Sequence, residues 1–208
     1  MYTIAWILRS MAWIPGQIII RFWYGYRVVG RENLKKIAYR GNGVLFISNH
    51  RSQLDPVFVA AALPFFSRLR PMYFISLPPY EYAHLAVGKY LYGGVIFRLF
   101  GSYPVYRGLK DYEKSFVHHI ELLGKGRSVC IFPEGAITKD AEGRPQSPRP
   151  GVGYLAQRTG ATIVPIAITG EKIVEVRIGE PFVSSGETPE ELMAHVVRLG
   201  NYTYTHGS

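Results

Sequence analysis

Cysteine is almost absent from this chain, and no apolar run is long enough to cross a membrane. Cys130 is the single cysteine in 208 residues, so a disulfide within the chain is excluded and a reducing compartment is favoured. Its position in the apolar run SVCIF indicates a packing role. A spanning helix needs roughly 20 consecutive apolar residues, but charged residues interrupt the two most apolar segments, residues 1–28 and 80–106. A transmembrane helix is therefore not expected.

Acidic residues are scarce relative to basic ones. The chain holds 24 lysines and arginines against 15 acids, a formal charge of +9, while 48% of its residues are hydrophobic and 14% aromatic. A basic balance favours an anionic partner, but the cations are spread singly among aromatic and aliphatic residues, and no nucleic-acid motif is present. An anionic lipid surface therefore fits better than nucleic acid. No repeat or shift in composition divides the chain, so one domain with its own core is expected.

The N-terminal segment is rich in tryptophan, tyrosine and isoleucine but is cut by two arginines and by Pro15 and Gly16. Two short helices hinged at Pro15 and Gly16 would place aromatic rings at headgroup depth and arginines near lipid phosphates. We therefore predict a membrane-associating helical segment over residues 1–28, a folded domain over residues 29–208, and a location at the cytoplasmic face of the cell membrane. Two alternatives stay open. The aromatic side chains cover the domain's own core, or the segment is a secretory signal, although no small-residue cleavage site follows it.

Strand-length and helix-length segments alternate along the rest of the chain. Short runs rich in Val, Ile, Phe and Tyr predict strands at residues 44–48, 72–76, 102–106, 129–132, 163–168 and 174–178. Helix-length segments lie between or after them, at about 55–64, 81–99, 110–124, 150–159 and 188–198. This order predicts an α/β fold, with a largely parallel sheet flanked by helices.

Two polar strings directly follow predicted strands. SNHRSQLDP contains Asn49, His50 and Asp55, and FPEG contains Glu134 and Gly135. Because open α/β sheets bind ligands at the ends of their strands, the two strings predict one site assembled from distant parts of the chain. The polar stretch TKDAEGRPQSPRP follows FPEG and holds three prolines, so we expect a loop that borders this site.

His50 and Asp55 are the expected catalytic pair. A histidine can take a proton from a hydroxyl near neutral pH, and a carboxylate on its other ring nitrogen stabilises the imidazolium that forms. Five residues would place the two side chains about 140° apart on a regular helix, so a turn must separate them. Pro56 provides one, and we expect Asp55 near a helix N-cap, accepting one bond from the helix start and one from His50. The alternative is a pair that only caps and stabilises the helix.

These strings resemble the motifs of the glycerolipid acyltransferase family, which includes the bacterial 1-acylglycerol-3-phosphate acyltransferases. The family's first motif is Asn-His-x-x-x-x-Asp, and NHRSQLD matches its spacing. FPEG is similar to the third motif, GSYPVYRG from Gly101 to Arg107 is similar to the second, and VPIAI around Pro165 is similar to the fourth. The four motifs occur in family order over residues 49–168.

The resemblance implies a reaction and a fold. His50 would deprotonate an acceptor hydroxyl, which attacks the thioester of acyl-CoA or acyl-carrier protein while Asp55 holds the imidazole. The acceptor would be 1-acylglycerol-3-phosphate in the membrane, and the product phosphatidic acid. No metal, no cofactor beyond the acyl donor and no covalent acyl-enzyme are implied. A hydrolase is disfavoured because no Gly-x-Ser-x-Gly string is present.

The resemblance also implies substrate-binding residues. Asn49, Glu134 and Gly135 would help to bind and position the acceptor, and Arg107 would offer its guanidinium to the acceptor phosphate. Simpler structural roles stay open for three of them. Glu134 would be a buried loop anchor, Gly135 a turn residue, and Arg107 a surface charge at a strand end.

The third motif departs from the family pattern. The family form continues Phe-Pro-Glu-Gly-Thr-Arg, whereas Ala136 and Ile137 follow FPEG here. Lys139, Arg144 or Arg149 would then replace the missing cation, or the acceptor is a lyso-aminolipid or a glycolipid. A non-catalytic, basic membrane-binding module remains the alternative of a different class.

Overall fold

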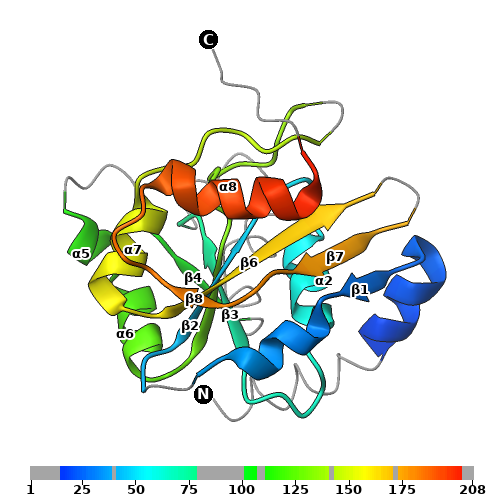
Figure 1. Ribbon diagram of the computed structural model, residues 1–208, viewed down its shortest axis with the longest axis horizontal. Coiled ribbons are helices and arrows are strands. Elements are labelled where there is room, and N and C mark those ends of the chain that lie inside the picture. Colours follow the sequence, from blue (N-terminus) through cyan, green and yellow to red (C-terminus); the bar gives the residue numbers. More distant parts are fainter. Residues whose placement is uncertain are drawn as a thin grey trace.

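One central sheet organises the structure, a computed structural model that describes residues 15–38, 41–78, 101–106, 111–140, 143–170 and 173–202. Within these residues, eight strands pair in the order β1-β7-β6-β2-β5-β3-β4, and β8 pairs with β6 (Figure 1). Strands β7 and β8 run antiparallel to β6, and the other neighbours are parallel. The strands are β1 (Arg27–Val29), β2 (Val44–Ser48), β3 (Met72–Ser76), β4 (Ser102–Pro104), β5 (Ser128–Ile131), β6 (Thr162–Thr169), β7 (Glu175–Ile178) and β8 (Phe182–Val183).

Helices cover both faces of this sheet. The described helices are residues 15–24, the 3-10 helix η1 (Arg31–Lys36), α2 (Asp55–Ala62), α5 (Tyr112–Ser115), α6 (Val117–Gly124), α7 (Gly151–Thr159) and α8 (Pro189–Gly200). Figure 1 shows α8 in front of the sheet and α2 behind it. In β2, Val44 and Phe46 join the apolar cluster on the α2 side, and Leu45 and Ile47 join the cluster formed with α6, α7 and α8. Because both faces are covered, β2 is apolar at almost every position.

The predicted fold class is confirmed: the protein has an α/β fold with a mixed, mostly parallel sheet flanked by helices. The strands at residues 44–48 and 72–76 have the predicted bounds, and the strand predicted at 102–106 ends at Pro104. The helix predicted at 110–124 is two helices, because the backbone leaves helical geometry at Phe116. The helix predicted at 81–99 lies outside the described residues.

The helix at residues 15–24 packs against α2. The Gln17 side chain donates to the Ala61 carbonyl at 2.8 Å, and just beyond the helix the Tyr26 hydroxyl donates to the Phe58 carbonyl at 2.7 Å. Ile20 is buried in the core cluster, whereas Phe22 is exposed. This segment therefore covers the core with one side and faces outward with the other. Among the described residues, no helix is long and apolar enough to cross a membrane.

Candidate active site

His50 and Asp55 meet at the carboxyl end of β2, as predicted. The Nδ1 atom of His50 lies 2.9 Å from Oδ2 of Asp55. The Asp55 side chain is 1% exposed and that of His50 is 18% exposed, so the carboxylate is buried behind a ring that reaches the surface. Because a carboxylate only accepts hydrogen bonds, the proton of neutral His50 lies on Nδ1. Its Nε2 atom, which no described residue hydrogen-bonds, is left as the acceptor for a substrate hydroxyl.

Asp55 lies beside the helix N-cap and bonds to His50, as predicted, but the predicted bond from the helix start is wrong. It is the first residue of α2, and its carboxylate does not cap the helix that follows it. Its Oδ2 atom accepts from the backbone N–H groups of Arg51 at 2.5 Å and Ser52 at 2.7 Å, and Oδ1 accepts from the Ser52 hydroxyl at 2.8 Å. The reason is that side chains in a first helical turn point back toward the N-terminus, here into the preceding loop. These donors offset the burial of the charge.

The ring of His50 is also held by stacking. It lies on the ring of Phe132, with centroids 4.3 Å apart and planes 21° apart. Phe132 is the first residue of FPEG and directly follows β5, which pairs with β2 in parallel. The sequence placed Phe132 at the site but gave no signal for this contact.

Glu134 joins the two predicted strings. Its Oε1 atom accepts from the His50 backbone N–H at 2.7 Å, and Oε2 accepts from the backbone N–H of Gln146 at 2.8 Å. Burial raises the pKa of this carboxyl to about 7, although the two backbone donors act in the opposite direction. Because both carboxylate oxygens of Glu134 already bond to backbone groups, neither is left as an unbonded oxygen for the acceptor. This geometry favours the loop-anchor interpretation over direct positioning of the acceptor.

The proline-rich loop borders the site, as predicted. The backbone N–H of Thr138 donates to the His50 carbonyl at 2.8 Å, and that of Arg149 donates to the Pro133 carbonyl at 2.8 Å. Gly135 begins the turn into this loop with a φ of 69°, a left-handed conformation that favours glycine. The turn interpretation of Gly135 is thus supported. The two backbone groups of His50 are both bonded, the N–H to Glu134 and the carbonyl to Thr138.

Asn49 lies behind the site and not on its surface. Its side chain is fully buried, its Oδ1 atom accepts from the Ile168 N–H at 2.7 Å, and its Nδ2 atom donates to the Ile168 carbonyl at 3.0 Å. The predicted contact between Asn49 and substrate is therefore not supported by this geometry. The amide is bonded to the backbone of β6 because β2 ends just before it, leaving the Ile168 peptide groups to be satisfied by a side chain.

The predicted phosphate-binding cations differ in their surroundings. Arg107 lies outside the described residues. Arg144 forms an ion pair with Asp140 at 2.9 Å, Arg149 donates from Nε to the Glu134 carbonyl at 3.3 Å, and Lys139 is exposed. Within the described part of the chain, no cluster of three or more His, Cys, Asp or Glu side chains could hold a metal ion.

Comparison with known proteins assigns a family. The protein-family profile described as Acyltransferase matches residues 25–169, well over half of the chain and both polar strings. The chain belongs to this acyltransferase family. It is 25% identical over 182 residues to the glycerol-3-phosphate acyltransferase of Baumannia cicadellinicola subsp. Homalodisca coagulata, covering 81% of this chain and 20% of that protein. It is also 25% identical to the protein of the same name from Actinobacillus pleuropneumoniae serotype 5b (strain L20), covering 92% of this chain and 23% of that protein.

This member of the acyltransferase family thus spans about a fifth of the length of these two relatives. The comparisons show distant homology to glycerol-3-phosphate acyltransferases. The narrower resemblance to 1-acylglycerol-3-phosphate acyltransferases stays a prediction.

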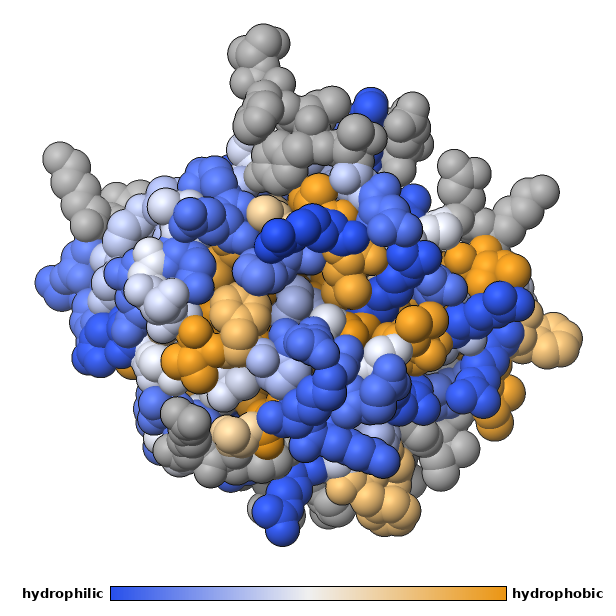
Figure 2. Space-filling view, viewed as in Figure 1, coloured by the Kyte–Doolittle hydropathy of each residue, from blue (hydrophilic) through white to orange (hydrophobic). Residues whose placement is uncertain are grey.

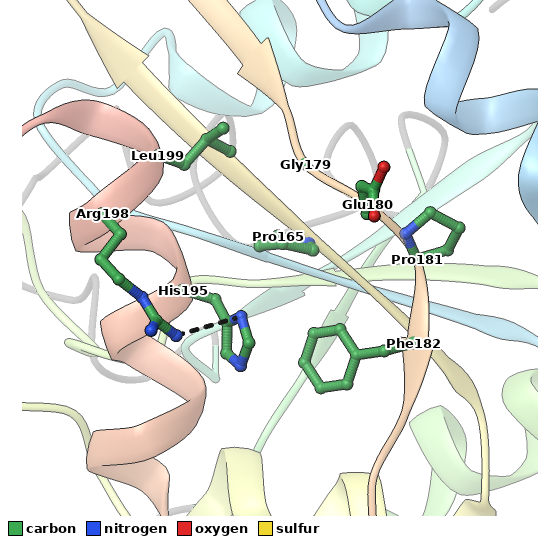
Figure 3. Close-up of a pocket in the computed structure, with 8 residues that line it drawn as sticks. All are labelled: Pro165, Gly179, Glu180, Pro181, Phe182, His195, Arg198 and Leu199. Carbon is green, nitrogen blue, oxygen red and sulfur yellow. Dashed lines mark hydrogen bonds between the residues drawn. The ribbon is translucent and has the colours of Figure 1, made fainter.

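A surface hollow lies along α8, and His50 is not among the residues that line it. It has a volume of about 530 Å³ and is lined by Pro165, Gly179, Glu180, Pro181, Phe182, His195, Arg198 and Leu199 (Figure 3). The ring of His195 stacks on that of Phe182, with centroids 4.5 Å apart. None of the described residues that line this hollow hydrogen-bonds to His50 or Asp55, so the hollow adds no group to the site at the end of β2.

Proposed function

We propose that this protein transfers a fatty acyl group from acyl-CoA or acyl-carrier protein to the hydroxyl of a lysophospholipid. The observation that carries the proposal is the His50–Asp55 pair. Nδ1 of His50 is bonded to a buried carboxylate, and Nε2 has no described protein partner. Membership in the acyltransferase family supports the same chemistry.

The geometry supports direct transfer. The acceptor hydroxyl gives its proton to Nε2 of His50 as its oxygen attacks the thioester carbonyl carbon. The tetrahedral intermediate then collapses, the carbon–sulfur bond breaks, and the leaving thiolate takes the proton back from the imidazolium. Asp55 stabilises that imidazolium. Ser52, a nearby hydroxyl, donates to Asp55, so it does not face His50 as a nucleophile would.

Three classes of acceptor are to be compared. We favour 1-acylglycerol-3-phosphate, which would give phosphatidic acid, because the four motifs resemble those of enzymes that use it. Glycerol-3-phosphate is the second acceptor to test, since two relatives are named for it. A lyso-aminolipid or glycolipid is the third, motivated by Ala136 and Ile137 in place of the family's Thr-Arg.

An acceptor panel tests this proposal. Purified protein is mixed with long-chain acyl-CoA, or with acyl-carrier protein as donor, and free thiol release is followed in lipid vesicles. The acceptors are lysophosphatidate, glycerol-3-phosphate, a lyso-aminolipid, a lysoglycolipid and none. We expect release that depends on lysophosphatidate and yields phosphatidic acid. Folded protein that releases no thiol with any donor and acceptor would contradict the proposal and favour the non-catalytic membrane-binding module.

We propose further that the protein works at the cytoplasmic surface of the cell membrane. Four exposed apolar side chains, here termed the apolar rim, support this: Phe22, Trp23, Leu54 and Val57 are 86%, 74%, 40% and 46% exposed. The helix at 15–24 runs along α2 in the opposite direction, because Gln17 bonds to Ala61 whereas the ring of Tyr24 contacts that of Phe58. Its exposed aromatic residues therefore lie near the start of α2, the end that holds Asp55.

Figure 2 shows exposed apolar surface at the right-hand edge of the molecule, over the helix at residues 15–24. Apolar side chains project there beside strongly hydrophilic ones. Rings at headgroup depth flanked by cations are typical of proteins that lie on a membrane surface. Such an arrangement would present the end of β2 to lipids in the bilayer.

Removing the two most exposed rings of the rim should weaken vesicle binding. Burial of each large apolar side chain contributes about 1.5 kcal/mol or more, so the double variant Phe22→Ser, Trp23→Ser should bind anionic vesicles ~100-fold more weakly. Cosedimentation with vesicles measures the change. Phe66→Ser is the matched control, since Phe66 is 94% exposed but follows the opposite end of α2. Equal losses in the control and the double variant would contradict the assignment.

A further inference from the structure

The carboxyl end of α8 returns toward the candidate active site. Asn201 has a φ of 56°, its N–H donates to the Arg198 carbonyl at 3.2 Å, and the Tyr202 N–H donates to the Val197 carbonyl at 3.0 Å. This is the Schellman pattern, in which one left-handed residue reverses the chain after a helix. Figure 1 shows the end of α8 beside the carboxyl end of β6.

Gly200 allows the tyrosine to fold back over the helix end. A Cβ atom at Gly200 would lie 2.3 and 2.4 Å from two ring carbons of Tyr202, and 3.3 Å from the Cβ of Ala167. The first two distances are well inside van der Waals contact, so an alanine there would displace the ring. The reversal at Asn201 and the absence of a side chain at Gly200 together aim the Tyr202 hydroxyl toward β6.

The Tyr202 hydroxyl joins the bonds that hold Asn49. It donates to the Ile168 carbonyl at 2.5 Å and accepts from Nδ2 of Asn49 at 3.3 Å. Pairing between β2 and β6 stops where Ser48 faces Ile166. Beyond that point, Asn49 bonds to both peptide groups of Ile168, and Tyr202 contacts both members of this cluster. The cluster extends the strand pairing to the residue directly before His50.

We propose that Tyr202 is a positioning residue of the acyl-transfer site. Its hydroxyl holds Asn49 against β6 and so fixes the strand end from which His50 projects, an inference that rests on the function proposed above. His50 is fixed on its other side by Glu134 and Thr138, which bond to its N–H and its carbonyl. Misplacing a catalytic group by even a small distance lowers the reaction rate.

Tyr202→Phe tests this role by removing only the hydroxyl. We expect kcat to fall about 3- to 10-fold with both KM values unchanged, as the loss of one hydrogen bond of ordinary strength would give. Gly200→Ala, which displaces the ring, should lower kcat at least as much. Tyr154→Phe is the matched control, since it removes a hydroxyl that bonds to Glu113 at the surface. It should leave kcat unchanged.

A second readout does not depend on turnover. The ring ¹⁵N signals of His50, assigned by comparison with His50→Ala, report which nitrogen carries the proton and at what pH the ring titrates. We expect Tyr202→Phe to shift them and Tyr154→Phe to leave them unchanged. If the wild type turns over no substrate, the proposed function fails and the ¹⁵N spectrum alone decides this inference. Unchanged His50 signals with unchanged kcat would overturn it, even if thermal stability fell.

Discussion

Asp55→Asn should lower kcat by about 10³- to 10⁴-fold, as loss of the carboxylate behind a catalytic histidine does elsewhere. The amide keeps the shape of the side chain but has no charge to stabilise the imidazolium. The KM values should stay near those of the wild type, because the Asp55 side chain is 1% exposed and cannot reach a substrate. Steady-state kinetics with the active acceptor measures both quantities.

Ser52→Ala separates the charge of Asp55 from its positioning. It removes the donor to Oδ1 but leaves the carboxylate and its three contacts on Oδ2. We expect kcat to fall only about 5-fold, as loss of one hydrogen bond would give. A folded Asp55→Asn protein with a kcat within tenfold of the wild type would show that the pair is structural only.

His119 should make the protein less stable in acid. Its side chain is fully buried in α6. Among the residues that the structure describes, neither ring nitrogen has a hydrogen-bond partner, and the Tyr103 backbone lies near the ring but outside hydrogen-bond geometry. Burial lowers the pKa of His119 from 6.5 to about 4. The unfolded chain therefore binds a proton between these values that the folded chain does not, and the free energy of unfolding falls as pH drops from 6.5 to 4.

His119→Leu measures this contribution. Because one pKa unit corresponds to about 1.4 kcal/mol, the variant should gain about 2 to 3 kcal/mol relative to the wild type between pH 7 and pH 4.5. Urea unfolding at pH 4.5, 5.5, 6.5 and 7.5 gives both free energies. A difference between variant and wild type that does not change with pH would contradict the prediction.

Glu134 has the opposite effect on the pH dependence of stability, and it offsets the contribution of His119 in the wild type. Its pKa is raised from 4.5 to about 7, so the folded chain binds the extra proton and stability falls as pH rises through this window. The two contributions oppose each other between about pH 4.5 and 6.5. The comparison of variant with wild type is therefore more informative than the wild-type profile alone.

The sequence predicted the elements whose signals are local. β2 was readable because both of its faces are buried, which leaves a continuous apolar run from Val44 to Ser48. The His50–Asp55 contact could be predicted because only four residues separate the two side chains, and Pro56 directly after Asp55 indicates a helix start there. In contrast, β1 and β8 have three and two residues, too few for a hydrophobic period to show.

The parts that were missed depend on long-range contacts. Asn49 bonds to residues 119 and 153 positions away, and no pattern around Asn49 indicates a buried amide in preference to a substrate contact. The motif resemblance implies that Glu134 positions the acceptor, with a buried loop anchor as the alternative, and the sequence alone does not decide between them. In the structure its oxygens bond to backbone N–H groups of two separate segments. Which backbone N–H and carbonyl groups are buried without a backbone partner depends on the fold, so the side chains that bond to them cannot be predicted from the sequence.

The most direct test of the account compares wild type with His50→Ala in the acyl-transfer assay, using the acceptor that the panel identifies. The account predicts that acyl transfer falls by at least ~10³-fold, while the far-ultraviolet circular dichroism spectrum and vesicle binding stay as in the wild type. Transfer by folded His50→Ala protein at a rate within tenfold of the wild type would contradict the assignment of His50 as the general base.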